Sequence, residues 1–113
     1  MTLGPAELAF VRSERIGRLA TVSPSGWPQV VPVMYSVGDG GGIWLEFDVD
    51  GAKLRNLTAD PRAAIVIDAM GPKRGISIQG RCVLVDPLRA RLMPVHSFSW
   101  GLETEAAPVS PTS

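Results

Sequence analysis

Two cationic side chains, Lys53 and Arg55, stand at the start of a short segment with helical spacing. Leu54 and Leu57 lie three apart on one face of that segment, and Asp50 is expected to cap its first turn. Cations near a helix N-terminus oppose the helix dipole, at a cost of about 0.3 to 1 kcal/mol each. A bound anion reverses this effect, because it meets free backbone N–H groups and two positive side chains. The spacing fits a phosphate site, and a solvated basic helix without a ligand fits it equally well.

The elements around this segment should hold it in place. Ile43 to Phe47 is an apolar and aromatic run of strand length, so a strand leads into the helix. The helix should end at Asp60, since Pro61 disfavours the α conformation in the residue before it. Apolar residues fill nearly every position of 63–68, which predicts a central strand covered on both faces.

The N-terminal part of the chain predicts a helix followed by a β-hairpin. Residues 5–15 have an amphipathic pattern, and we expect this helix to close one end of a barrel. Residues 16–22 and 27–37 are two strands joined by the turn sequence Ser-Pro-Ser-Gly. Pro32 lies inside the second strand and cannot donate a ladder hydrogen bond, which places it at an edge or a bulge. The backbone there should face either a ligand or water.

The C-terminal part predicts a strand and a short helix. Residues 76–85 form the strand, and Gly80 marks an expected bulge where it bends around a barrel. Cys82 falls in the buried part of this strand and is expected to be a core residue rather than a reactive thiol. An Asp-Pro pair at 86–87 predicts a helix through about Met93.

These elements predict one mainly β domain over residues 1–102. The five expected strands are not separated by long helices, which favours an antiparallel barrel with short helices at its ends. Residues 103–113 have the composition of a disordered tail.

Composition argues against several classes of function. Eleven basic and eleven acidic residues give zero formal net charge, unlike most proteins that bind nucleic acids or membrane surfaces. No apolar run approaches the roughly 20 residues of a membrane span, and the N-terminus lacks a signal-peptide pattern. With one Cys and one His, neither a disulfide framework nor a Cys/His metal site is expected. The expected location is the cytoplasm.

Four segments in combination resemble a known family: IGRLATVSPSGWPQVVPV, the aromatic strand after it, KLRNLTADPRAAIVID and ISIQGRCVLVDP. They are similar to the split β-barrel family named after pyridoxamine 5'-phosphate oxidase. Within it they resemble the branch of oxidoreductases that use the deazaflavin coenzyme F-420. The resemblance runs from about Phe10 to Met93. It implies an antiparallel split β-barrel with short flanking helices, and a homodimer whose cofactor lies in the cleft between two barrels.

The resemblance also implies which residues hold the cofactor. The phosphate contacts fall on Lys53, Arg55 and Asn56, in agreement with the charge argument above. Lys73 and Arg74 would approach the cofactor tail from the other side.

The cofactor ring should lie along the second strand of the hairpin. The residues that the resemblance places there are Val30, Val31, Pro32, Val33 and Met34. Ala20, Thr21 and Val22 would line the neighbouring strand, with the Thr21 hydroxyl available to a polar atom of the ring.

The C-terminal end should differ from that of relatives, which usually continue into a final strand after the last helix. Because this chain turns to Ala, Pro, Ser and Thr soon after Trp100, we expect a barrel closed by five strands plus the partner subunit, or a more open cleft. His96, Phe98 and Trp100 would then either reach the partner's cofactor or substrate, or cover the barrel end.

The leading hypothesis is an oxidoreductase that transfers a hydride between bound coenzyme F-420 or FMN and a small conjugated substrate. The residues offer no Ser/His/Asp set and no metal cluster, and a ring that carries the hydride itself needs neither. Protonation would come from water, Tyr35 or His96. Lys73 and Arg74 suit the acidic extension of a deazaflavin and favour it over FMN. The alternative is a non-catalytic module that binds a flavin or a haem, and true pyridoxamine phosphate oxidation is least favoured because a second phosphate site is not apparent.

Overall fold

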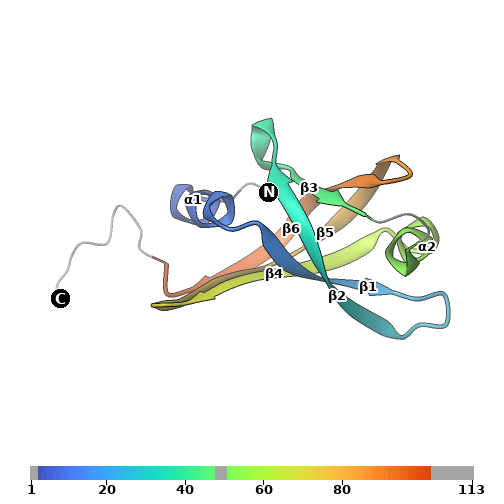
Figure 1. Ribbon diagram of the computed structural model, residues 1–113, viewed down its shortest axis with the longest axis horizontal. Helices are drawn as coiled ribbons and strands as arrows, with labels where there is room; N and C mark the ends of the chain where they lie inside the picture. Colours follow the sequence, from blue (N-terminus) through green and yellow to red (C-terminus); the bar gives the residue numbers. More distant parts are fainter. Residues whose placement is uncertain (1–2, 48–50, 103–113) are drawn as a thin grey trace, which may run out of the picture.

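The computed structural model describes residues 3–47 and 51–102, which form a closed antiparallel barrel with a helix at each end (Figure 1). Its strands are β1 Ile16–Val22, β2 Pro28–Val37, β3 Ile43–Glu46, β4 Arg62–Met70, β5 Lys73–Asp86 and β6 Arg89–Trp100. The helices are α1 Pro5–Ser13 and α2 Ala52–Ala59, with a 3-10 turn at Asp39–Gly41. The strands close in the order β1-β2-β3-β6-β5-β4. The mainly β barrel with short flanking helices is therefore confirmed.

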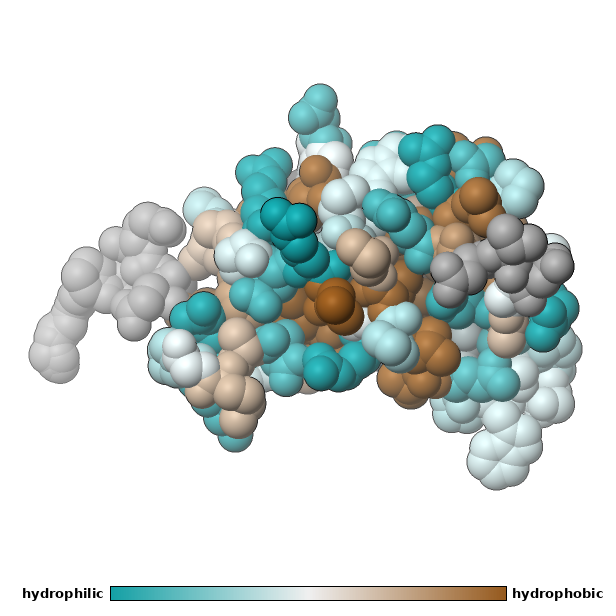
Figure 2. Space-filling view, in the orientation of Figure 1, coloured by the Kyte–Doolittle hydropathy of each residue, from teal (hydrophilic) through white to brown (hydrophobic). Residues whose placement is uncertain are grey.

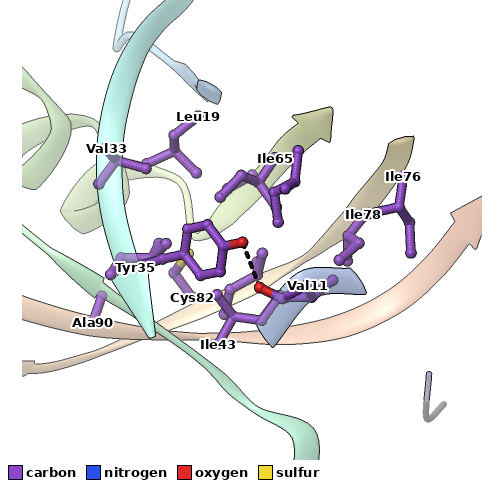
Figure 3. Close-up of a cluster of buried hydrophobic side chains, with 14 of the residues drawn as sticks. Val11, Leu19, Val33, Tyr35, Ile43, Ile65, Ile76, Ile78, Cys82 and Ala90 are labelled. Carbon is purple, nitrogen blue, oxygen red and sulfur yellow. Dashed lines mark hydrogen bonds between the residues drawn. The ribbon is translucent and has the colours of Figure 1, made fainter. Parts of the chain in front are cut away.

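The barrel interior is filled by aliphatic side chains that alternate along each strand. Ile65 and Ile67 of β4 lie opposite Ile78 and Ile76 of β5, and all four are fully buried (Figure 3). Leu19 adds a further buried side chain from β1. Burial of one such side chain contributes about 1.5 to 3 kcal/mol, so this inward row holds the strands in register.

Helix α1 closes the end of the barrel that is opposite α2 (Figure 1). Its Phe10 and Val11 are buried against the core. The Tyr35 hydroxyl donates a buried hydrogen bond of 2.6 Å to the Val11 carbonyl (Figure 3). The expectation that this helix closes one end of the barrel is confirmed.

The predicted helix after Asp86 is wrong, because the chain makes a tight turn and returns as β6. The Asp86 carboxylate accepts hydrogen bonds from the Leu88 backbone N–H at 2.9 Å and from Arg89 Nε at 3.0 Å. These bonds build a turn rather than a helix cap. Ala90 and Leu92 then alternate inward with a period of two, which is a strand pattern.

Strand β6 also corrects the expectation of five strands. It pairs with both β3 and β5, and so it closes the barrel within a single chain. The barrel therefore needs no strand from a partner subunit. The expected irregularity at Gly80 is confirmed, since the β5–β6 register shifts between Gln79 and Gly80, but the extra residue lies on β6 rather than on β5. None of the described helices is long and apolar enough to cross a membrane.

Cys82 is buried in the core, as expected, and its thiol should be unreactive in the native protein. Burial raises the pKa of this thiol to about 12, so almost no thiolate forms at pH 8. We expect a thiol reagent at pH 8 to modify Cys82 only as fast as the protein unfolds. In denaturant the same reagent should modify one thiol per chain at once, because the chain contains one Cys. Complete modification of the native protein within the time of the denatured control would contradict this burial.

Candidate functional site

Among residues 3–47 and 51–102, no strand pairs with the first part of β2 on the edge that faces away from β1. β1 pairs with β2 from Pro28 to Met34, whereas β3 pairs with β2 only from Met34 onward. The Tyr35 N–H donates to the Arg15 carbonyl at 3.0 Å. Because hydrogen-bonded pairs alternate along an antiparallel ladder, the odd-numbered residues of β2 bond to β1 and the even-numbered residues face the opposite edge.

The polar groups of this free edge come from Val30 and Pro32. Val30 directs both its N–H and its C=O away from β1, and Pro32 directs its C=O there. A proline at this position removes no ladder bond, because it would have no strand to donate to. The prediction that Pro32 lies where the backbone faces something other than a strand is confirmed.

The N-terminus of α2 lies beside this edge. Its N-cap is Gly51 rather than the expected Asp50, which is outside the described residues, and its C-cap is Asp60, as expected. The first turn contains no acidic residue. Lys53 lies in this first turn, at the positive end of the helix dipole, and no acidic side chain of the turn offsets its charge. Its Nζ lies 5.8 Å from the centre of the Phe47 ring.

A cavity of about 360 Å³ lies between the β2 edge and the start of α2. It is lined by Thr21, Gln29, Val30, Val31, Ala52 and Lys53. The structure thus brings together the predicted cation, the predicted hydroxyl and part of the predicted ring strand. A positive ammonium and a free backbone edge facing one apolar hollow can hold an anion at one end and a flat polar ring along the side.

Asn56 has a different place from the one that the sequence predicted. It is buried, and its Nδ2 donates to Thr21 Oγ1 at 2.9 Å and to Gln29 Oε1 at 2.6 Å. An amide nitrogen has two hydrogens, so neither is left for a phosphate. Asn56 therefore fixes α2 against β1 and β2, and it orients the two polar side chains that line the cavity.

Gln29 and Phe47 were missed by sequence reasoning. Gln29 lines the cavity and accepts from Asn56, and Phe47 lies under the Lys53 ammonium. The alternation of β2 puts Gln29 on the same side as Val31, so strand periodicity could have identified it. For Phe47 the sequence contains no comparable pattern, because its contact with Lys53 crosses from the end of β3 to α2.

The other predicted residues of this region point in different directions. Val33 is buried in the core and offers a ligand no side-chain surface. Pro32 and Met34 are exposed on the outer face of the hairpin, and Met34 retains 57% of its accessible surface. Arg55 is exposed on α2.

Lys73 and Arg74 lie at the other end of the barrel from α2 (Figure 1). Cys82 lies nine positions after Lys73 on β5, and its N–H donates to the Pro61 carbonyl just after α2. At about 3.3 Å per residue this separation is roughly 30 Å. Arg74 instead lies 5.4 Å from the centre of the Phe10 ring on α1. Within one chain these cations cannot reach an anion held by Lys53.

Tyr35 cannot act as the proton donor that the sequence allowed. Its side chain is 5% exposed and its hydroxyl already donates to Val11. Burial, with a smaller contribution from the charge of Glu14, raises the pKa of the phenol well above its usual range. His96, the other candidate, is exposed on β6.

Tyr35→Phe should reduce stability without changing the chemistry of the site. We expect the free energy of unfolding to fall by about 1 to 2 kcal/mol, since the buried Val11 carbonyl loses a donor. Urea unfolding measures this loss. Any activity assayed per folded molecule should equal that of the wild type, and a loss of tenfold or more would contradict the exclusion of Tyr35 as a proton donor.

Comparison with known proteins places this geometry in a family. The sequence profile described as pyridoxamine 5'-phosphate oxidase matches residues 3–111. No curated protein matches the chain. Among solved structures, a conserved hypothetical protein from Mycobacterium tuberculosis is similar over 88% of this chain and 86% of its own, with 26% identity and a TM-score of 0.74.

Two further solved structures share the fold at lower identity. An F-420 reductase is 18% identical over 85% of this chain and 98% of its own, with a TM-score of 0.73. A haem-binding protein from Mycobacterium smegmatis is 22% identical over 89% of this chain and 55% of its own, also with a TM-score of 0.73. Proteins with this barrel therefore bind chemically different ligands.

Proposed function

The chain belongs to the pyridoxamine 5'-phosphate oxidase family, and from that premise we propose that it is an oxidoreductase with a flavin-type cofactor. The cofactor is coenzyme F-420 or FMN, and the substrate is a small conjugated molecule. The observation that carries the proposal is the cavity between the β2 edge and α2, where Lys53 meets the positive end of a helix. Both candidate cofactors join a flat ring to a phosphate, and the cavity offers a partner for each part.

Different residues of the cavity would bind different parts of the cofactor. Lys53 and the first-turn N–H groups of α2 would take the phosphate, because they supply positive charge and free donors. The N–H and C=O of Val30 and the C=O of Pro32 would bond to the polar edge of the ring. Thr21 accepts from Asn56 through its oxygen, so its own hydroxyl hydrogen is left to donate to the ring.

The chemistry needs few side chains. When bound, the ring accepts or supplies the hydride, and the protein contributes binding, orientation and a shaped electrostatic environment. Tyr35 is buried and already bonded, so water or His96 is left to supply a proton. The apolar walls at Val30 and Val31 would keep water from one face of the ring.

Lys73 and Arg74 can join this site only from a second copy of the chain. We therefore include a homodimer in the proposal, with these two cations of one copy near the cofactor tail held by the other. The outer face of the β1–β2 hairpin supports it, since Ile16, Val30 and Met34 are each more than half exposed there. In Figure 2, hydrophobic residues lie near the middle of the face in view, in the region where Figure 1 labels β1 and β2. Exposed apolar surface of this kind is suited to contact with a second copy of the chain.

The choice between coenzyme F-420 and FMN depends on the part of the cofactor beyond the phosphate. Coenzyme F-420 carries an acidic extension beyond its phosphate, for which a pair of cations is suitable, so we favour it over FMN. The visible spectrum of the purified protein, followed by titration of each cofactor against the fluorescence of Trp27, Trp44 and Trp100, tests this choice. Saturable binding of either cofactor supports the proposal, and tighter binding of F-420 supports the preference. Absence of saturable binding by both would overturn the proposal.

A second candidate is a non-catalytic binding module of the same fold. The similarity to a haem-binding protein supports it, because that barrel holds a ligand of another class. Steady-state turnover with reduced F-420 or FMN and a panel of conjugated acceptors separates the two. Tight cofactor binding with no turnover on any acceptor would favour the module. We keep the cytoplasm as the expected location, since the one Cys is a free thiol.

A further inference from the structure

A second cavity, larger than the one between β2 and α2, lies on the outer surface of the barrel near the start of β4. It has a volume of about 480 Å³, within the usual range for small-molecule sites. Its apolar wall includes Ala20 and Val22 of β1, Ala64 of β4 and Val95 of β6. Alanines at two of these positions, Ala20 and Ala64, leave the strands uncovered, and the hollow is the result. Ala20 and Val22, which the sequence placed beside the cofactor ring, belong to this cavity instead.

The β5–β6 bulge supplies one wall of the cavity. Gln79 pairs with His96, and the next residue of β5, Gly80, pairs with Pro94. Val95 is therefore the extra residue of β6 and has no partner across the ladder. Bulges redirect a side chain in this way. Val95 retains 61% of its accessible surface and lines the cavity with an apolar side chain.

The polar rim of the cavity is positively charged. Arg62 and Arg81 lie directly opposite each other on β4 and β5, and both line the cavity. The Asp60 carboxylate accepts two bonds from the Arg62 side chain, Nε to Oδ1 at 3.0 Å and Nη2 to Oδ2 at 2.7 Å, and a third from the Arg62 backbone N–H at 3.1 Å. These bonds, with a weaker contribution from the charge of Arg81, lower the pKa of the Asp60 carboxyl to about 2. The carboxylate stays ionised at neutral pH and is already engaged by Arg62.

Arg81 interacts with the Asp60 carboxylate only at longer range, through its charge. Its side chain forms no ion pair with any residue in 3–47 or 51–102. Two guanidinium groups against one carboxylate leave a net charge of +1 at the rim. Gln79 lies on the same strand and also lines the cavity, so its amide adds an N–H donor near Arg81.

We propose that this cavity is a binding site for a small monocarboxylate with an apolar body. The carboxylate would bond to the guanidinium of Arg81, which presents two parallel N–H groups, and the Gln79 amide would donate a third bond. The apolar body would lie against Ala20, Ala64 and Val95. The charge of +1 selects one negative group, and the apolar wall selects against a highly charged ligand such as a nucleotide tail.

The site is separate from the proposed cofactor cavity, although the two are adjacent. Within the described part of the chain, Thr21 is the one residue that lines both. Lys53 lines only the cofactor cavity and Arg81 only the carboxylate cavity, so the two sites can be tested independently. The inference depends on the residues of the second cavity and does not require that a cofactor binds.

Benzoate and its neutral isostere benzamide are suitable probes, titrated calorimetrically into the full-length protein at constant ionic strength. We expect saturable binding of benzoate that is at least about tenfold tighter than that of benzamide, because only benzoate carries the charge. Arg81→Gln should weaken benzoate binding at least about tenfold and should leave benzamide binding unchanged. Ala64→Leu should weaken both, because it fills the apolar wall.

Lys53→Ala is the control, and it should bind benzoate as the wild type does. Thermal unfolding checks that each variant is folded, which is expected because Arg81 is exposed on the surface of β5. Equal affinity for benzoate and benzamide would overturn the proposal. Unchanged benzoate binding by Arg81→Gln would also overturn it, and so would an equal loss in Lys53→Ala, which would assign the binding to the cofactor cavity.

Discussion

Lys53→Ala is expected to weaken cofactor binding about 10- to 150-fold, which corresponds to roughly 1.5 to 3 kcal/mol for a charge-assisted bond to phosphate. The loss should be similar for FMN and coenzyme F-420, since in the proposed site both would present a phosphate to the start of α2. Fluorescence titration of each cofactor measures it. The fold should be retained, because Lys53 lies at the helix start and contacts the ring of Phe47 only through a cation–π interaction.

Arg81→Gln is the matched control for Lys53→Ala. It removes a cation from β5 and leaves the cofactor cavity intact. Cofactor affinity should therefore stay within a factor of about two of the wild type. If Lys53→Ala also leaves the affinity unchanged, Lys53 does not contact the phosphate. If both variants weaken binding equally, the effect is one of overall charge rather than of a site.

Gly80→Ala is expected to lower the free energy of unfolding by about 3 kcal/mol, the upper end of the range for overpacking. A Cβ at Gly80 collides with the backbone carbonyl of Met93 on β6. A side chain could rotate away from such a contact, but a backbone carbonyl in a ladder cannot. The bulge that exposes Val95 must therefore shift or open. Urea unfolding monitored by tryptophan fluorescence gives the change in stability.

Gly71→Ala is the control for this substitution. A Cβ at Gly71 meets no atom within 4 Å, and its φ is not in the left-handed region. Its effect on stability should be within about 0.5 kcal/mol. Equal stability of Gly80→Ala and Gly71→Ala would mean that the bulge tolerates a side chain, and the geometry at Val95 would then need another explanation.

The two cavities depend on different kinds of interaction. The cofactor cavity depends on Asn56, which joins α2 to Thr21 and Gln29 through two short hydrogen bonds. The carboxylate cavity depends on a bulge and on the arginine pair at its rim. Thr21 lines both cavities and bonds to Asn56, so it gives a ligand in one site a direct structural link to the other.

The sequence predicted correctly those helices and strands in which the local residue pattern and the tertiary contacts favour the same secondary structure. The β1–β2 hairpin, the central strand β4 and the helix ending at Asp60 lie within one or two residues of their predicted ends. The failure was at Asp86, where an Asp-Pro pair fits both a helix cap and a tight turn. The alternation of Arg89, Ala90, Arg91 and Leu92 favours the turn and strand, because two of these residues must enter the core.

By itself, the sequence determined the mainly β class, the cation at the start of α2 and the unpaired proline in β2, because each depends on residues that are close in the chain. Only the tertiary structure decided that Asn56 fixes α2 in place, that Lys73 and Arg74 lie at the far end of the barrel, and that Arg62 faces Arg81. These are contacts and distances between residues far apart in sequence, and they depend on the barrel closure and register that the buried core of all six strands establishes together.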